Sequence, residues 1–346
     1  MVDRIEKNPG ARLDVKAFQD AQQRLDTRAV VRSLPPGLTE EDFVSILRLA
    51  LLTECATNSY AAVFEEGARK ADAQWLRRFN TNVWVPDELL HAAPFKVLLM
   101  SMGYTEGELD RQVRETQEKS YTHGSGTLPV QLTTFGLMQE YLTDHWYGLI
   151  AHLVHPAAPE AALMVARVKK RETLHTVWYR NMTAIQVESN PRLLGPLAET
   201  LAKFSMPGNA LVPELQGRAT AWLPKMGGDF QHMARDMVRL IHESTGDVKR
   251  MGRVLVDIAA HKGYHHGPVS ARTAKRALDG LGGPGYGLIG EAILERVGLS
   301  HVFSKQKKGR AILFHNTLAE RVRAPVRSWI ARQLEVSFDA MNVQPA

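Results

Sequence analysis

The chain has 346 residues, of which 44% are hydrophobic, so it is long enough to bury a substantial core. Its single cysteine excludes an intrachain disulfide and an iron–sulfur cluster held by four thiolates, and it is typical of a reducing, cytoplasmic compartment. No run of eighteen apolar residues occurs, and the N-terminus lacks the apolar stretch of a signal peptide. We therefore expect neither a membrane span nor secretion.

The net charge of +6 and the basic cluster at 305–310 could indicate binding to nucleic acid. No aromatic-rich nucleic-acid motif accompanies that cluster, so we expect no nucleic-acid partner. A basic surface would also attract a strongly acidic protein, such as an acyl carrier protein, through complementary charge. Lys249, Arg250 and Arg253 are candidates for such a docking face.

The pattern predicts an all-α fold, because helix signals dominate and the best strand candidate, residues 310–315, is weak. Capping residues and breakers predict helices at 39–70, 72–102 (ending at Gly103), 106–120, 129–152 and 159–189. Four of these are near thirty residues long, which is about 45 Å at 1.5 Å per residue. Helices of that length are typical of a four-helix bundle.

Glutamate and histidine recur on these long helices in a regular order. Two Glu-x-x-His pairs are each preceded by a lone glutamate: Glu54, then Glu88 and His91, then Glu140, then Glu172 and His175. With 22 Glu and 13 His in the chain, chance alone gives about one Glu-x-x-His pair, so only the context can carry weight.

That context favours metal binding. Positions i and i+3 share one face of a helix, so each pair can touch the same ion. All six residues also lie in apolar helix stripes, where an unpaired carboxylate is costly to bury. Four carboxylates and two imidazoles from four helices are the ligand set of a di-iron centre in a helical bundle. For any single residue, a buried ion pair or a polar pocket is the alternative.

The residues around these ligands resemble the soluble, ferritin-like acyl-acyl-carrier-protein (acyl-ACP) desaturases, over about residues 30 to 240. The markers are the stretch 75–103 with Asp87-Glu88-Leu-Leu-His91, then Gln139-Glu140-Tyr-Leu-Thr143, then Glu172-Thr-Leu-His175, and finally Ser205-Met-Pro-Gly-Asn. The resemblance implies two iron ions with these ligands: bridging Glu88 and Glu172, terminal Glu54 and Glu140, and one histidine per iron, His91 and His175.

The same resemblance implies an O₂-dependent reaction that removes two hydrogens from neighbouring carbons of a carrier-bound acyl chain. Thr143 would be a catalytic hydroxyl near the oxygen site, although a helical threonine commonly bonds its own backbone instead. Electrons would come from a ferredoxin-type donor, because the chain has no dinucleotide fingerprint and cannot hold an iron–sulfur cluster. Members of this family are homodimers, so we expect a homodimer.

Three residues near the ligands bear on how far the resemblance extends. Arg171 stands where plant-type enzymes carry an acid, and Pro86 lies inside a metal-bearing helix, where it should bend the turn before Glu88. Asp87 is expected to face outward or to support a ligand from behind. The departures favour a bacterial lipid or natural-product desaturase over a plant enzyme. They leave two alternatives open: a di-iron oxygenase that hydroxylates or N-oxidises a small or carrier-bound metabolite, and a non-catalytic ferritin-like metal binder.

The sequence also predicts a division into a di-iron bundle domain, residues 1–245, and a helical C-terminal extension, residues 246–346. The extension should contain helices at 248–261, 269–278, 288–297 and 318–336. We expect it to pack outside the bundle and cover the mouth of an acyl channel, with the glycine-rich loop 280–287 allowing movement. The alternative is an ordinary structural appendage.

Overall fold

The computed structural model describes residues 1–229 except 22–24, 120 and 123–125, and beyond them only 232, 233, 236, 237, 240 and 244. Within this part of the chain every regular element is a helix, which confirms the predicted all-α class. None of these helices has both the length and the apolar character needed to cross a membrane. The following predictions lie outside the described residues: the extension 246–346 with its four helices, the loop 280–287, the strand 310–315, the basic cluster 305–310 and the docking residues Lys249, Arg250 and Arg253.

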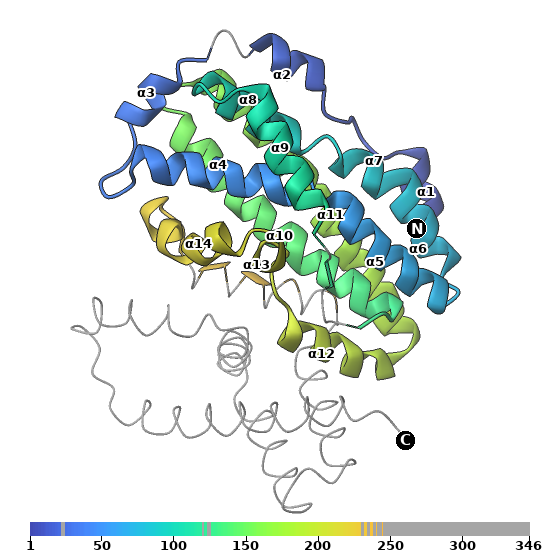
Figure 1. Cartoon of the computed structure of the whole chain (residues 1–346). Coiled ribbons are helices and arrows are strands. Elements are labelled where there is room, and N and C mark those ends of the chain that lie inside the picture. Colours follow the sequence, from blue (N-terminus) through green and yellow to red (C-terminus); the bar gives the residue numbers. More distant parts are fainter. Residues whose placement is uncertain are drawn as a thin grey trace, which may run out of the picture.

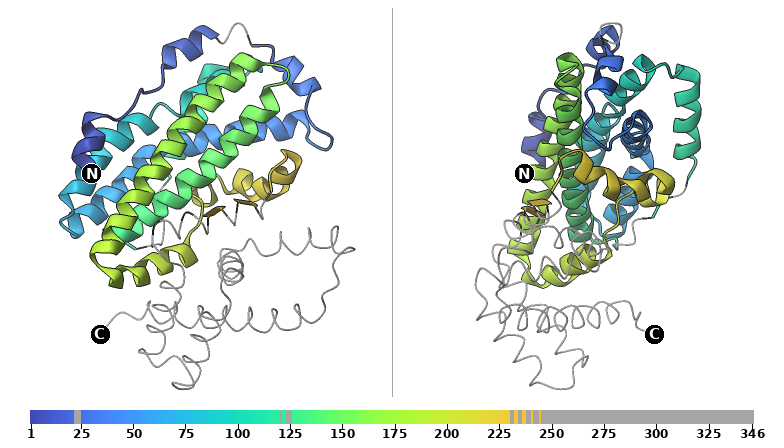
Figure 2. Two further views of the ribbon diagram at one scale, coloured as in Figure 1. Left: turned by 180° about the vertical axis from the view of Figure 1, so that it is seen from behind. Right: turned by 90° about the vertical axis from the view of Figure 1, so that its left-hand side faces the viewer.

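Two uninterrupted helices, α10 (Pro129–Val154) and α11 (Pro159–Ser189), form the longest contact in the fold and lie side by side (Figure 2). Each begins with proline, whose missing N–H costs nothing in the first turn of a helix. The connection between them, residues 155–158, is short, which makes the two helices antiparallel neighbours. The predicted bounds of α11 are confirmed, and α10 extends two residues past the predicted end.

The helix predicted at 39–70 is divided into α4 (Glu40–Glu54) and α5 (Thr57–Lys70). Its predicted start is confirmed: Thr39 accepts a hydrogen bond from the N–H of Asp42, and the Asp42 carboxylate accepts one from the N–H of Thr39. The break falls directly after Glu54, whose carbonyl accepts the hydroxyl hydrogen of Thr57 at 2.7 Å. The Thr57 side chain thus occupies the Glu54 carbonyl, which a continuous helix would use as a backbone hydrogen-bond acceptor.

The helix predicted at 72–102 is divided as well. The segments are α6 (Gln74–Phe79), the π-helical turn η2 (Asn80–Trp84), α7 (Val85–Glu88) and α8 (Ala92–Ser101). The π turn ends directly before Val85-Pro86, and proline has no N–H to continue the α-helical ladder. The bend expected at Pro86 stays a prediction. Gly103 follows α8 with φ +101°, which confirms it as the glycine that ends the helix.

Shorter helices surround these segments: α1 (Val2–Lys7), α2 (Val15–Ala21), α3 (Thr27–Arg32), α9 (Glu106–Gln117), η3 (Pro191–Leu193), α12 (Leu194–Lys203), α13 (Gly208–Leu211) and α14 (Pro213–Lys225). α1 packs on α6, α2 on α8 and α11, α9 on α4, α12 on α10, and both α13 and α14 on α4 (Figure 1). α9 ends three residues before its predicted end.

The buried apolar side chains form two large clusters. One is built mainly from α5, α6, the first half of α10 and the second half of α11, and the other from α4, α8 and the opposite halves of α10 and α11. Along α10 the change of cluster falls between Tyr141 and Tyr147, beside Glu140. Along α11 it falls between Val168 and Trp178. A buried polar layer therefore separates two apolar regions.

Candidate metal centre

The six residues predicted as ligands all lie in this polar layer. They come from four places in the fold. Glu54 ends α4, Glu88 and His91 lie at the junction of α7 and α8, Glu140 lies within α10, and Glu172 and His175 lie within α11. Each is at most 4% exposed. Below, Glu88 and Glu172 are called the paired glutamates, and Glu54 and Glu140 the lone glutamates.

The two Glu-x-x-His pairs face each other across the layer. One ligand atom from each of the four side chains lies within 4.8 Å of the other three. His91 Nδ1 lies 2.6 Å from Glu172 Oε1, and His175 Nδ1 lies 2.6 Å from Glu88 Oε1. Each histidine is farther from the glutamate of its own pair, at 3.3 Å for His91 and 3.7 Å for His175. The two imidazole rings are nearly parallel, with centroids 5.4 Å apart.

The lone glutamates complete a twofold arrangement. Glu54 Oε2 lies 3.8 Å from His91 Nδ1, and Glu140 Oε2 lies 3.6 Å from His175 Nδ1. Each imidazole Nδ1 is thus within 4.0 Å of three carboxylates, namely both paired glutamates and one lone glutamate. Two ions that share the paired glutamates would need this division of ligands.

Several of these buried atoms have no hydrogen-bond partner of acceptable geometry among the described residues. They are Glu88 Oε1, both carboxylate oxygens of Glu172, and Nδ1 of His91 and of His175. Buried polar atoms normally form hydrogen bonds. Several buried atoms without one that converge on one place therefore point to a missing cationic partner. Carboxylate oxygens and imidazole nitrogens are ligands of several divalent metals, including iron, manganese and zinc. The residues present therefore fit a metal ion.

Aromatic donors hold the lone glutamates. The Tyr147 hydroxyl donates to Glu54, and Trp84 Nε1 donates to Glu140 Oε1 at 3.2 Å. Tyr147 and Trp84 are both 1% exposed. Their donor roles were not predicted. The available signal was that a buried tyrosine or tryptophan needs a hydrogen-bond partner.

Asp87 does not face outward, so that expectation is wrong. It is 1% exposed, and its Oδ2 accepts hydrogen bonds from His175 Nε2 at 2.8 Å and from Arg171 Nε at 2.7 Å. Charged hydrogen bonds offset the cost of burying this acid. Because Arg171 lies 84 residues away in the sequence, no local pattern could pair them. The alternative expectation, that Asp87 supports a ligand from behind, agrees with its contact to His175.

Thr143 lies one turn after Glu140 and is buried. Its hydroxyl donates to the backbone carbonyls of Gln139 at 3.1 Å and Glu140 at 3.0 Å. The backbone alternative described for this residue is therefore the arrangement observed. A catalytic role for Thr143 stays a prediction.

The charges of these groups follow from burial and from one another. Burial raises the pKa of both lone glutamates, and the neighbouring carboxylates raise it further. Burial also acts to raise the pKa of the paired glutamates, but the two histidines outweigh it and lower that pKa. Burial acts to lower the pKa of the histidines, yet the carboxylates raise it well above its ordinary value. A metal ion bound at this site would therefore compete with protons.

Cys55, next to Glu54, does not join the ligands. Burial, helped by the Glu54 carboxylate, raises the pKa of its thiol to about 12. The thiol donates to the Leu52 carbonyl at 3.2 Å. Since the thiolate is the form that binds metal and reacts, Cys55 is a structural thiol.

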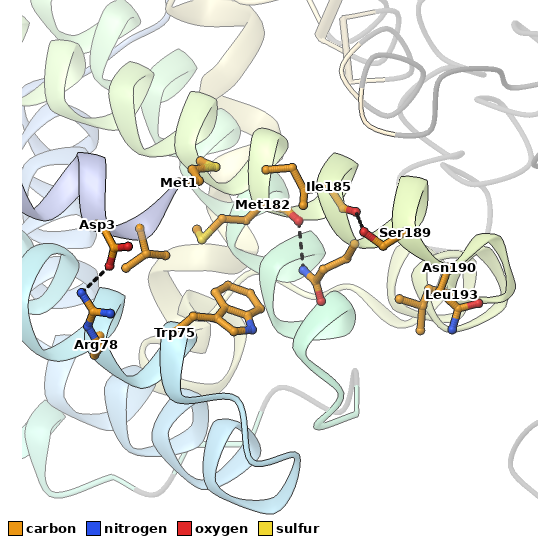
Figure 3. Close-up of a pocket in the computed structure, with 11 residues that line it drawn as sticks. Met1, Asp3, Trp75, Arg78, Met182, Ile185, Ser189, Asn190 and Leu193 are labelled. Atoms are coloured by element: carbon orange, nitrogen blue, oxygen red, sulfur yellow. Dashed lines mark hydrogen bonds and ion pairs between the residues drawn. The ribbon is translucent and has the colours of Figure 1, made fainter.

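Two cavities stand out among the described residues, and none of the six ligands lines either. The first, about 470 Å³, lies between α1, α6 and the end of α11, with Trp75, Met182 and Ile185 on its walls (Figure 3). The second, about 850 Å³, is a groove between residues 10–14 and the outer face of α11. Its lining includes Leu174, Val177 and a set of cationic side chains: Arg12, Arg167, Lys169, Lys170 and Arg171.

A scan against models of protein families finds no match for this chain, and a search of the curated proteins finds none either. What the site can do therefore follows from its geometry and from the sequence motifs that flank its residues.

Proposed function

We propose that this chain is an O₂-dependent oxidoreductase that uses two iron ions in a ferritin-like bundle to desaturate an acyl chain carried on acyl carrier protein. The observation that carries the proposal is the twofold set of buried ligands, in which each imidazole Nδ1 faces three carboxylates. The sequence motifs around the same residues resemble those of the acyl-ACP desaturases. The geometry supports the metal pair, and the motifs supply the substrate class.

An iron pair, when bound, supplies two-electron redox chemistry with O₂. The protein's own side chains exclude water and orient the ligands. Asp87 accepts from Nε2 of His175, which leaves Nδ1 of that ring to face the carboxylates. Tyr147 and Trp84 fix the lone glutamates by donating hydrogen bonds to them.

The proposed partners are acyl carrier protein, a ferredoxin-type electron donor and a second copy of the chain. The groove beside α11 supports an acidic partner, because three of its cations, Arg12, Arg167 and Lys170, have no acidic partner among the described residues. Carrier proteins of this type are acidic, so charge complementarity would steer them to such a surface. The docking surface expected from sequence at 249–253 lies outside the described residues.

A second candidate is a di-iron oxygenase that hydroxylates or N-oxidises a small or carrier-bound metabolite. Arg171 favours it, because this residue departs from the plant-type pattern and contacts Asp87 directly beside the ligands. The same ligand set serves both reactions, so the bound substrate decides between them.

The test is to reconstitute the full chain with iron, reduce it, and supply an acyl-carrier thioester and O₂. A product two hydrogens lighter supports desaturation, and one that is an oxygen heavier supports the oxygenase. The Glu172→Ala variant should give neither product. Iron binding without O₂ consumption would mean a non-catalytic metal binder, and a protein that takes up zinc but no iron pair would contradict the proposal.

A further inference from the structure

The twofold arrangement of ligands does not extend to the outer nitrogens of the two histidines. His175 Nε2 lies 2.8 Å from Asp87 Oδ2 and forms a hydrogen bond with it. His91 Nε2 lies 3.9 Å from the same oxygen and has no hydrogen-bond partner among the described residues. One imidazole is therefore held from behind and the other is not.

Asp87, which contacts His175, is in turn contacted by Arg171. This arginine is 6% exposed, and its Nε donates to Asp87 Oδ2 at 2.7 Å. Its other two nitrogens donate to backbone carbonyls, Nη1 to Ala11 at 3.2 Å and Nη2 to Pro9 at 2.8 Å. All three guanidinium nitrogens thus donate hydrogen bonds. The contacts connect the N-terminal segment 9–11 to Arg171, Arg171 to Asp87, and Asp87 to His175. This series of contacts is called the support chain below.

The N-terminal segment is shaped for this contact. Gly10 has φ +78°, a conformation that favours glycine, and a Cβ added there would lie 2.7 Å from Arg171 Nη1.

The helices that carry the two histidines also differ. His175 lies within the unbroken α11, whereas His91 lies in the break between α7 and α8.

We propose that the two metal positions are unequal: the position served by His175 binds its ion first and more tightly, because the support chain fixes that imidazole. Arg171 is then a positioning residue that acts through Asp87. Groups that hold a metal-bound histidine from behind typically change metal affinity by about 10–100-fold. This inference rests on the proposed two-metal centre.

The test is an anaerobic titration of the metal-free, full-length protein with Co²⁺, a probe that accepts the same oxygen and nitrogen ligands. Two binding steps of different affinity are expected. Arg171→Leu should weaken the tighter step by about 10–100-fold and leave the weaker step unchanged. Lys169→Leu is the matched control, because it breaks a 2.9 Å ion pair between α11 and α10 that touches no ligand.

Three further variants separate positioning from a general structural effect. His175→Ala should remove the tighter step, and adding Arg171→Leu to it should cause no further loss, because both changes act on one position. Gly10→Ala disturbs only the outer end of the support chain and should weaken the same step by a smaller factor. It tests the idea even if Arg171→Leu does not fold.

The outcomes are distinguishable. Two ions bound with one common affinity, or an Arg171→Leu variant that weakens both steps equally, would overturn this inference and leave the two-metal proposal standing. A protein that binds fewer than two ions would instead overturn the proposed function, and the inference with it.

Discussion

The straight helices α10 and α11 and the broken segments α4 to α8 each supply half of the proposed metal ligands. Glu140, Glu172 and His175 lie within unbroken helices. Glu54 and Glu88 are the last residues of α4 and α7, and His91 lies in the gap before α8. Every ligand on the broken half thus sits at an interruption of the backbone hydrogen-bond ladder.

This difference shows that the two halves hold their ligands by different means. A helix interior fixes a side chain through its own backbone, whereas a residue at a helix end depends on tertiary contacts. π-helical turns such as η2 are frequent at functional sites, where they re-aim the side chains that follow. The broken half should therefore respond more strongly to loss of neighbouring contacts.

The largest effect is expected at the paired glutamates, one on each half. Glu88→Ala and Glu172→Ala should each abolish O₂-dependent turnover, because each carboxylate faces both histidines and would be shared by both ions. The helical content should stay largely unchanged, as measured by circular dichroism. Turnover that survives in either variant would show that the two halves do not contribute to one site.

The next effect concerns pH. Because the pKa of both histidines and both lone glutamates is raised, these groups hold protons at pH values where they would otherwise have lost them. Metal binding should release those protons, so affinity should increase as pH rises. Calorimetry in buffers of different ionisation enthalpy measures the release. Binding without proton release would contradict the charge distribution described for the site.

A smaller effect is expected from the donors to the lone glutamates, and it compares the halves directly. Tyr147→Phe removes the hydrogen bond to Glu54 on the broken half, and Trp84→Phe removes the one to Glu140 on the straight half. Both should lower metal affinity, by about tenfold for Tyr147→Phe and by less for Trp84→Phe. Metal titration of the two variants side by side checks the order, and the reverse order would contradict the comparison.

The smallest effect on the site is expected from Asp42, which ties the broken half to α14. Its carboxylate accepts from Trp222 Nε1 at 2.8 Å and Arg218 Nη2 at 2.8 Å. Burial acts to raise the pKa of Asp42, but the hydrogen bonds from Trp222 and the Thr39 N–H, together with Lys225, lower it to about 2. Asp42→Ala should cost about 2 kcal/mol of stability at neutral pH and change metal binding little.

The pH dependence of that loss follows from the sign of the shift. A lowered folded-state pKa stabilises the protein above the unfolded value of about 4, and this contribution disappears as pH falls towards 2. Thermal denaturation should therefore show a large difference between the two proteins at neutral pH and a small one near pH 2. An equal difference in stability at both pH values would show that the stabilisation does not come from the ionised Asp42 carboxylate.

Much of the straight half could be predicted from sequence. Proline at the first position and Asn190-Pro191 at the end mark the bounds of α11. On the broken half, the capping box at Thr39 marks the start of α4. The Glu-x-x-His spacing correctly placed Glu88 beside His91 and Glu172 beside His175, because positions i and i+3 share a helix face.

The rest depended on contacts that a local pattern does not contain. The break at Cys55 leaves the apolar spacing nearly unchanged on both sides, so periodicity runs through it. Pro86 predicted a bend, but the π turn and the burial of Asp87 also depend on packing and on Arg171, which is distant in sequence. The donor roles of Tyr147 and Trp84 likewise arise only when separate helices meet.

The separation of the buried interior into two apolar clusters bears on how such a site is kept over evolutionary time. Replacing a buried ionic layer with well-packed apolar residues often stabilises a protein. A descendant that exchanged these acids and histidines for leucine and phenylalanine would join the clusters into one core and gain stability while losing the centre. Selection for stability alone would therefore replace the buried polar residues, and only selection for their chemistry would preserve them.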